Sequence, residues 1–383
     1  MIHPDFKFLR AVFLMIGGLV GVGVFGLPFA FAQSGIALGL LELLLIGGVL
    51  MIVQFMYAEL AVQTEGSHRL VGFVEYFLGK NWSRVSLLAM CASVWGAMLA
   101  YMIIGGTFLS YLLSPVLGGS VMWYSVAVWA VAAVLVRGGL RFASKLEVFV
   151  IIALAFLFLF MMVVSVPYIR PAHFTAVNPS QWFLPYGIIL FALSSTGIVP
   201  EMREVLGVRA KKQLGKAVLV GMSSVIFLYA LFSLAVVGVR GAETTRMAFD
   251  GLIPVFGGSF GVITAVLGLV TILSIFMMVG ISLQNMLKFD LDRTRFQSYV
   301  LTVSVPLLLF LSGVREFLSL IGFLGAVFGG ILGILIVRCY MKLKHEPLCK
   351  ERHCLDVPNS VSVLAILFFL LGIILSLRQF LLY

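Results

Sequence analysis

Charged side chains are scarce in this sequence of 383 residues. Its 26 basic and 16 acidic side chains make up 11% of the chain, while hydrophobic residues make up 62% and mean hydropathy is +1.14. A soluble domain averages about 45–50% apolar and about 25% charged residues. A soluble protein could not bury this much apolar surface, because its surface is too large relative to its volume. The composition therefore excludes soluble enzymes and nucleic-acid-binding proteins, and it predicts a membrane protein of the all-α class with the lipid bilayer as its surroundings.

Cysteine is also scarce, with four residues at positions 91, 339, 349 and 354. They show no spacing typical of an extracellular disulfide scaffold. The loop from His345 to Cys354 contains two histidines and two cysteines, but their spacing matches no strong zinc pattern. Metal binding by this loop stays an open alternative. No His, Cys or acidic cluster lies at the depth of a pocket, so we expect neither an enzyme nor a cofactor.

Long apolar runs fill the rest of the chain. A membrane-spanning helix needs about 20 predominantly apolar residues, and the sequence holds eleven candidate spans. They run from Phe8 to Ala32, Ile36 to Leu60, Val85 to Leu113, Ser120 to Val136, Phe142 to Val166, Phe183 to Leu206, Leu214 to Val239, Ser259 to Leu287, Phe296 to Leu311, Phe317 to Met341 and Val357 to Leu382.

The basic residues between these spans predict an orientation. With the N-terminus in the cytoplasm, 21 of the 26 basic residues fall in cytoplasmic segments. The outside segments hold the remaining five, which are Arg170, Arg240, Arg246, Arg315 and Arg378. Because positive charge is retained on the cytoplasmic side, we expect a multi-pass protein of the cell (inner) membrane with its N-terminus inside and its C-terminus outside.

The first span contains an interruption. Residues Gly17 to Pro28 include five glycines and a proline, which disfavour a continuous helix. Pro28 suits the first turn of a restarting helix, where its missing N–H is not needed. The alternative is a close helix contact, because Gly17 and Gly21 form a common packing pattern.

The sixth span contains a matching interruption at residues 194–201, Ser-Ser-Thr-Gly-Ile-Val-Pro-Glu. A simple proline kink at Pro200 is the alternative. The two breaks lie five spans apart in helices of opposite direction, which indicates an inverted repeat. That arrangement is typical of secondary transporters with a substrate site at the middle of the membrane. We therefore expect a first repeat at residues 1–170, a second at 171–345, and a loop with an extra span at 346–383.

At these motifs the sequence resembles the amino acid–polyamine–cation superfamily. The stretch Gly18 to Phe25 is similar to its glycine-rich first helix, and Gly26-Leu27-Pro28-x-Ala30 resembles the amino acid/auxin permeases and the bacterial tryptophan/tyrosine permeases. Residues 191–201 and 288–313 are similar to the same group. The resemblance implies a LeuT-like fold of ten core helices plus one. It also implies cation-coupled import of an amino acid, with hydrophobic or aromatic amino acids favoured. An amino-acid sensor on the same fold and a transporter of another small solute are the alternatives.

The resemblance also implies a substrate site. Gly21, Val22 and Gly23 would offer backbone N–H groups to the substrate carboxylate. Side chains that face the amine or line the pocket would be Phe191, Ser194, Ser195, Thr196 and, from the third span, Tyr101 and Trp95. Ordinary helix packing is the alternative for Tyr101 and Trp95.

A coupling-ion site is implied between the first and eighth spans. A sodium ion would use backbone carbonyls near Gly17 and Val20 with the hydroxyls of Thr271 and Ser274, which share a helix face. The next residue is Ile275, where sodium-coupled relatives often have another hydroxyl, so the site lacks one ligand. We therefore favour H⁺ over Na⁺ as the coupling ion, with Glu42 or Glu201 as proton carrier. An intramembrane carboxylate is costly unless it is paired or hydrated, and the alternative for Glu42 is a place near the headgroups.

Overall fold

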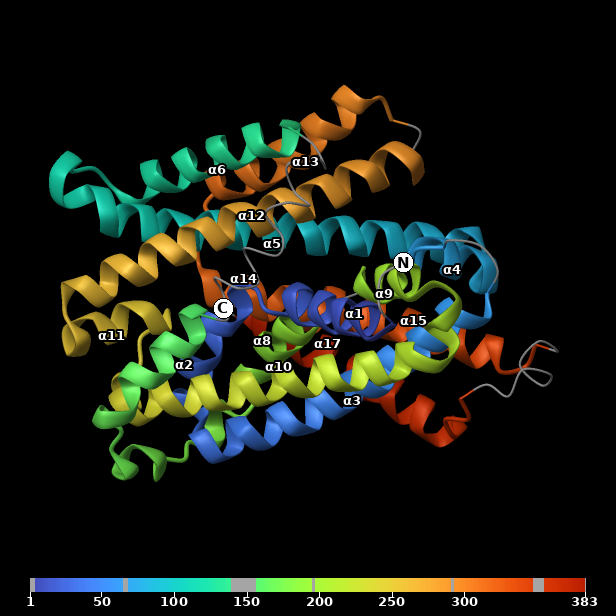
Figure 1. The fold of residues 1–383 in the computed structure, drawn as a ribbon, viewed down its shortest axis with the longest axis horizontal. Coiled ribbons are helices and arrows are strands. Elements are labelled where there is room, and N and C mark those ends of the chain that lie inside the picture. The colour runs from blue at the N-terminus through green and yellow to red at the C-terminus, as the bar shows by residue number, and fades with distance from the viewer. Residues whose placement is uncertain are drawn as a thin grey trace.

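The computed structural model describes residues 4–64, 68–138, 156–194, 197–290, 293–346 and 355–382. These residues form helices and connecting turns, with no strand among them. Most of the long helices run roughly side by side along the long axis of the molecule (Figure 1). The all-α class expected from the composition is confirmed.

The first predicted span consists of three pieces. Helix α1 (Pro4–Leu19) ends before the glycine-rich segment, a short 3₁₀ helix η1 (Val22–Gly26) follows, and α2 (Leu27–Ser34) completes the span. The two parts of the span are bent by 49°. Gly21 is extended, with φ −125° and ψ −159°. Pro28 is the second residue of α2, where its missing N–H breaks no helical hydrogen bond.

The sixth predicted span also has two helical pieces. Helix α8 (Leu184–Leu193) ends at Ser194, which is extended with φ −82° and ψ 122°. Helix α9 (Ile198–Leu206) begins after Gly197. Residues 195 and 196 lie outside the described residues.

Helices are present at the other predicted spans. They are α3 (Ile36–Gln63), α5 (Lys80–Leu117), α6 (Val121–Gly138), an apolar helix at Phe156–Tyr168, α10 (Ala210–Arg240), α12 (Gly258–Asp290), α13 (Arg295–Leu311), α14 (Phe317–Phe323) continued by a π-helix η7 (Leu324–Gly329) and α15 (Gly330–Leu343), and α17 (Asn359–Leu382). The connections contain α4 (Leu70–Leu78), α11 (Ala248–Phe256) and the 3₁₀ turns η2 (Val166–Tyr168), η3 (Pro171–Phe174), η4 (Pro179–Gln181), η5 (Gly207–Arg209) and η6 (Gly241–Glu243).

Length and composition test which helices could cross a membrane. Among the described residues, seven helical stretches qualify, and the bent pair of the first span is an eighth. One of these stretches, Leu184–Glu243, covers the sixth and seventh predicted spans, while Phe156–Tyr168 and Arg295–Leu311 are shorter apolar helices. Much of the fifth predicted span, residues 142–155, is outside the described residues. The number of eleven and the division into two repeats and a final segment stay predictions.

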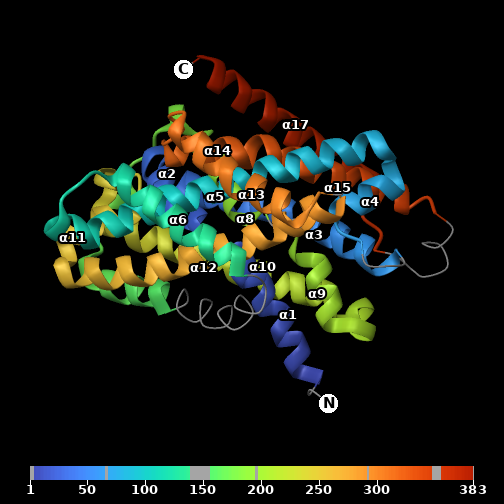
Figure 2. The same ribbon diagram turned by 90° about the horizontal axis from the view of Figure 1, so that it is seen from above.

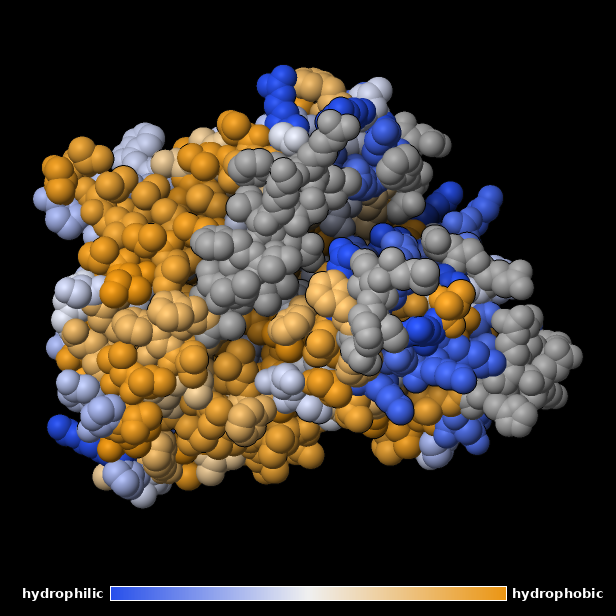
Figure 3. Space-filling model, viewed as in Figure 1, coloured by the Kyte–Doolittle hydropathy of each residue, from blue (hydrophilic) through white to orange (hydrophobic). Residues whose placement is uncertain are grey.

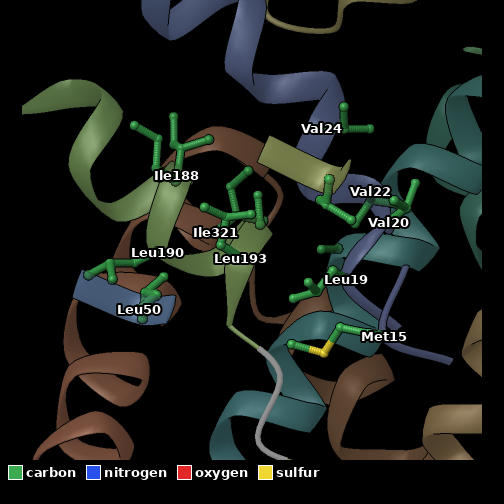
Figure 4. Close-up of a cluster of buried hydrophobic side chains, with 14 of the residues drawn as sticks. Met15, Leu19, Val20, Val22, Val24, Leu50, Ile188, Leu190, Leu193 and Ile321 are labelled. Carbon is green, nitrogen blue, oxygen red and sulfur yellow. The ribbon is translucent and has the colours of Figure 1, made fainter. Parts of the chain in front are cut away.

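Two groups of helices pack against each other. Helices α5, α6, α12 and α13 contact one another and lie together at the top of Figure 1. The other group consists of the broken spans with α3 and α10. Figure 4 shows that buried side chains of the first span, including Leu19 and Val22, gather with Leu193 of α8 and Ile321 of α14. The breaks therefore lie inside the molecule, where η1 and most of α8 are buried, while the outer parts of α1 and α9 extend from the bundle (Figure 2).

The tenth span approaches the sixth very closely. A Cβ atom added to Gly325 in η7 would lie 2.0 Å from the carbonyl oxygen of Gly187 in α8. Only glycine allows this approach, which is a common device for packing helices within a membrane. The contact holds η7 against α8 between Gly187 and Phe191, in the turns that precede the break of the sixth span.

Polar side chains gather at one end of the molecule. Figure 3 shows hydrophilic residues at the end that contains α4 and α9, while the middle of the visible face is hydrophobic. The N-terminus lies toward this polar end and the C-terminus toward the other end (Figures 1 and 2). The side of the membrane that each terminus faces stays a prediction.

Candidate functional site

A cavity of about 300 Å³ lies between the two broken spans and the helices α5 and α12. It brings together nine residues that the sequence predicts for substrate or ion binding. They are Gly17, Val20, Gly21, Val22, Gly23, Tyr101, Phe191, Ser194 and Glu201. These residues come from α1, the first break, α5, α8, the second break and α9, so segments far apart in the sequence form one site.

The break of the first span has a side that faces the cavity and a side that is packed. A Cβ atom added to Gly21 would lie 3.1 Å from the hydroxyl of Tyr101, which also lines the cavity. A Cβ atom added to Gly23 would lie 2.9 Å from the Cα of Ala192 and 3.1 Å from Phe191. The absence of a side chain at Gly21 therefore keeps space beside Tyr101, while its absence at Gly23 lets the break pack on the end of α8.

The break of the sixth span contributes Ser194, whose hydroxyl lies close to the tenth span. A Cβ atom added to Gly329 of η7 would lie 3.2 Å from that hydroxyl oxygen. Ser195 and Thr196, the other two hydroxyl residues predicted for the site, lie outside the described residues. Trp95 donates a hydrogen bond from Nε1 to the carbonyl of Leu301 in α13, at 3.1 Å. The indole of Trp95 is therefore bonded to α13, as the packing alternative expects.

The two candidate proton carriers, Glu201 and Glu42, lie in different helices, and only Glu201 lines the cavity. Glu201 lines the cavity, and its carboxylate lies 3.4 Å from Arg69 Nη1. Arg69 also approaches Glu204, at 3.7 Å. Glu42 lies in α3, which contributes no described residue to the lining of the cavity. Both carboxylate oxygens of Glu42 are buried without a hydrogen-bond partner among the described residues.

The candidate ion site is only partly assembled. Gly17 and Val20 line the cavity, whereas Thr271 and Ser274 are buried in α12 outside its lining. The hydroxyl of Ser274 donates to the carbonyl of Val270 in the same helix, at 2.9 Å. The hydroxyl of Thr271 is buried with no hydrogen-bond partner among the described residues. That bond uses the proton of Ser274 and leaves the lone pairs of its oxygen free, so what separates this hydroxyl from the cavity is its position in α12.

The cavity also contains residues that the sequence interpretation missed. They are chiefly Met90, Ser93, Val94 and Ala97 of α5, Ile275, Met278, Val279 and Ser282 of α12, and Leu324, Gly325 and Gly329 of η7. Two features of the sequence could have indicated these residues. Ser282 lies on the helix face of Thr271, eleven residues later, and the run of glycines at 322–333 marks a close approach of helices.

A second, larger cavity of about 550 Å³ lies between α2, α8, α14 and α17. Its lining includes Arg246 and Glu316, which form an ion pair. None of the residues predicted for substrate or ion binding lines it. The chemistry expected from the sequence therefore belongs to the smaller cavity.

Metal ligands do not gather in the part of the chain that the structure describes. No group of three or more His, Cys, Asp or Glu side chains there could hold an ion. The loop from His345 to Cys354 is outside the described residues from position 347 onward, so this does not test it.

Comparison with known proteins decides the family. The sequence profile of the tryptophan/tyrosine permease family matches residues 5–379. This chain belongs to the tryptophan/tyrosine permease family. The resemblance inferred from the glycine-rich first span and the sixth-span motif is thereby confirmed.

A relative and a solved structure are similar to this permease. "Glutamine transporter 2" of Aliivibrio fischeri (strain ATCC 700601 / ES114) is 22% identical over 332 residues, which cover 84% of this permease and 86% of the relative. The crystal structure of MhsT in complex with L-phenylalanine superposes with a TM-score of 0.67 at 15% identity, covering 97% of this permease and 98% of MhsT. The likeness to MhsT confirms the LeuT-like fold. This permease is a multi-pass secondary amino acid transporter and not an enzyme.

Proposed function

We propose that this permease imports a neutral amino acid with a bulky side chain, in symport with protons, through the cavity between its two broken spans. The observation that carries the proposal is the cavity itself, because it gathers nine residues predicted for binding from six separate segments. Binding at the break of two half-helices, with helices on both sides, suits a transporter that exposes its site alternately to each side of the membrane.

The backbone of the first break supplies the polar contacts. Residues 20 and 21 lie outside regular helix, and η1 begins at Val22. Backbone N–H groups at the start of a helical segment have no helical partner and favour a carboxylate. The Ser194 hydroxyl and the unpaired carbonyls at the helix ends are then available to the substrate amine. An amino acid would thus be held mainly through its backbone groups.

The rest of the lining favours a neutral substrate. Met90, Val94, Phe191 and Leu324 give an apolar wall for a side chain. Among the described lining residues the charged side chain is Glu201, which disfavours acidic amino acids. The family name and both relatives point the same way, since tryptophan, tyrosine, glutamine and L-phenylalanine are all neutral.

We favour proton coupling because the candidate sodium ligands of α12 and the candidate proton carrier Glu201 differ in their position relative to the cavity. Hard cations such as sodium need several oxygen ligands at close range, and the hydroxyl residues Thr271 and Ser274 lie outside the lining of the cavity. Glu201 lines the cavity, whereas Glu42 does not. A carboxylate at that place can take up a proton on one side of the membrane and release it on the other. We therefore assign Glu201, rather than Glu42, as the proton carrier.

Uptake into proteoliposomes tests the function. The purified permease is reconstituted and supplied with radiolabelled L-tryptophan, L-tyrosine, L-phenylalanine or L-glutamine, with L-glutamate as the acidic control. At least one neutral amino acid should accumulate when the outside is acidic and sodium is absent. Accumulation that needs sodium and ignores the pH gradient would remove the proton assignment. Uptake of none of the four neutral amino acids would remove the substrate class.

Reporter fusions test the proposed topology in the inner membrane. A fusion at Lys211 should report the cytoplasm, and a fusion at Gly119 should report the outside. The reverse result would contradict both the orientation and the direction assigned to each broken span.

A further inference from the structure

Tyr229 lies behind both breaks. It belongs to α10, it is fully buried, and its hydroxyl oxygen lies 2.8 Å from the carbonyl oxygen of Leu19 and 3.2 Å from that of Ala192. Leu19 is the last residue of α1, and Ala192 is the last but one of α8. One phenol group therefore contacts the ends of two half-helices that are more than 170 residues apart in the sequence.

These two carbonyls need an external donor. The last four carbonyl groups of a helix have no partner within it, and the membrane interior offers no bulk water to replace one. The C-terminal end of a helix also carries partial negative charge, so two such ends side by side repel each other. A hydroxyl between the two helix ends donates the hydrogen bond that the carbonyls lack and offsets that repulsion.

The hydroxyl reaches the breaks from outside the cavity lining. Tyr229 is not part of the described cavity lining, although Leu19, Gly21 and Ala192 are. Tyr229 therefore contacts backbone next to the binding segment without being part of the cavity lining.

We propose that Tyr229 is a positioning residue for the substrate-binding backbone. Its hydroxyl holds the end of α1 against the end of α8, and this sets the place of the Gly21–Gly23 segment at the cavity. A phenol has a single proton, so it cannot donate a full hydrogen bond to both carbonyls at once. If α1 moved away from α8, the hydroxyl would stay hydrogen-bonded to only one of the two carbonyls. The proposal rests on the proposed function in one respect, namely that the cavity binds an amino acid.

Substitution by phenylalanine removes the hydroxyl and keeps the ring. Tyr57→Phe is the matched control, because Tyr57 is also fully buried and its hydroxyl has no hydrogen-bond partner among the described residues. Binding of L-tryptophan, L-tyrosine, L-phenylalanine and L-glutamine to the purified permease is measured for both variants. Loss of the bonds lowers the population of the binding-competent backbone, so Tyr229→Phe should weaken binding by about tenfold. Tyr57→Phe should bind within about twofold of the unsubstituted protein.

A third variant separates the donor from the packing of the ring. Tyr229→p-aminophenylalanine has an N–H donor at the position of the hydroxyl, and it should restore most of the lost affinity. Equal binding by the Tyr229→Phe and Tyr57→Phe variants, or no recovery with p-aminophenylalanine, would overturn the proposal.

Hydrogen–deuterium exchange without any amino acid gives an independent result. Backbone amides of residues 17–26 should exchange faster in Tyr229→Phe than in Tyr57→Phe, and p-aminophenylalanine should slow them again. Unchanged exchange in this segment would overturn the proposal. If the unsubstituted protein binds none of the four amino acids, the proposed substrate class fails, while the exchange result still decides the role of Tyr229.

Discussion

Gly21 and Gly23 stand two residues apart in the same break, yet their surroundings differ. At Gly21 the nearest neighbour of an added Cβ is the tip of a side chain, the Tyr101 hydroxyl at 3.1 Å. At Gly23 it is the Cα of Ala192 in α8, at 2.9 Å, and this backbone atom cannot rotate away. The break thus has a cavity side, which begins at Gly21, and a packed side, which includes Gly23 and the Tyr229 contacts. Changes on the cavity side should alter binding, and changes on the packed side should alter the fold or the position of the backbone.

Gly23→Val should have the largest effect, because it places a branched side chain against the backbone of α8. Overpacking a tight contact costs about 1–3 kcal/mol, and more where backbone must move. We expect little folded protein in size-exclusion chromatography. Gly48→Val is the control, since a Cβ atom there would meet no atom within 4 Å. A well-folded Gly23→Val variant would show that the packed side of the break is not tight.

Glu201→Gln should have the next largest effect, because it removes the carboxylate on the cavity side. We expect loss of uphill accumulation driven by a pH gradient, while exchange of labelled for unlabelled amino acid continues. Glu42→Gln, away from the cavity lining, should still accumulate substrate. Accumulation by Glu201→Gln together with its loss in Glu42→Gln would reverse the assignment of the proton carrier.

Gly21→Ala should have a moderate effect on binding and leave the fold intact. The Tyr101 hydroxyl must shift by a few tenths of an ångström, so affinity should fall about three- to tenfold, or about 0.7–1.4 kcal/mol. The same change in a Tyr101→Phe background should cost less, because the next nearest atom of Tyr101 lies 3.9 Å from the added Cβ. Equal costs in the two backgrounds would show that these residues do not interact.

Arg69→Ala should have the smallest effect. Its ion pairs with Glu201 and Glu204 join side chains that are about half exposed, at 46–50%. Exposed ion pairs contribute about 0–1 kcal/mol and are screened by salt. The melting temperature should therefore fall slightly at low ionic strength and match the unsubstituted protein at high ionic strength. A large loss that salt does not reduce would mean that Arg69 is part of the site itself.

Much of the fold could be predicted because the membrane imposes simple rules. Apolar length predicted the helices, and glycine and proline predicted interruptions at residues 17–28 and 194–201, since both residues disrupt helical hydrogen bonding. In the structure α1 ends at Leu19, inside the first of these segments, and α8 ends at Leu193, directly before the second. The residues near the breaks could be predicted for the same reason. Their grouping around one cavity followed from the resemblance to a known family.

The parts of the site that could not be predicted depend on the direction in which individual side chains point. Spacing alone does not show that Ser274 bonds within its own helix, or that Trp95 bonds to Leu301. The role of Tyr229 was invisible because nothing in the sequence of α10 signals a contact with carbonyls at positions 19 and 192. The same holds for η7, whose glycines indicate close packing but not the helix they pack against.

A structure of this permease with a bound amino acid would show whether the smaller cavity is the substrate site. The amino acid is the one of L-tryptophan, L-tyrosine, L-phenylalanine and L-glutamine that binds best. We predict density in the smaller cavity, with the carboxylate at the Gly21–Gly23 backbone and the side chain toward Phe191 and Leu324. Density only in the larger cavity beside Arg246 and Glu316, with the smaller cavity empty, would contradict it.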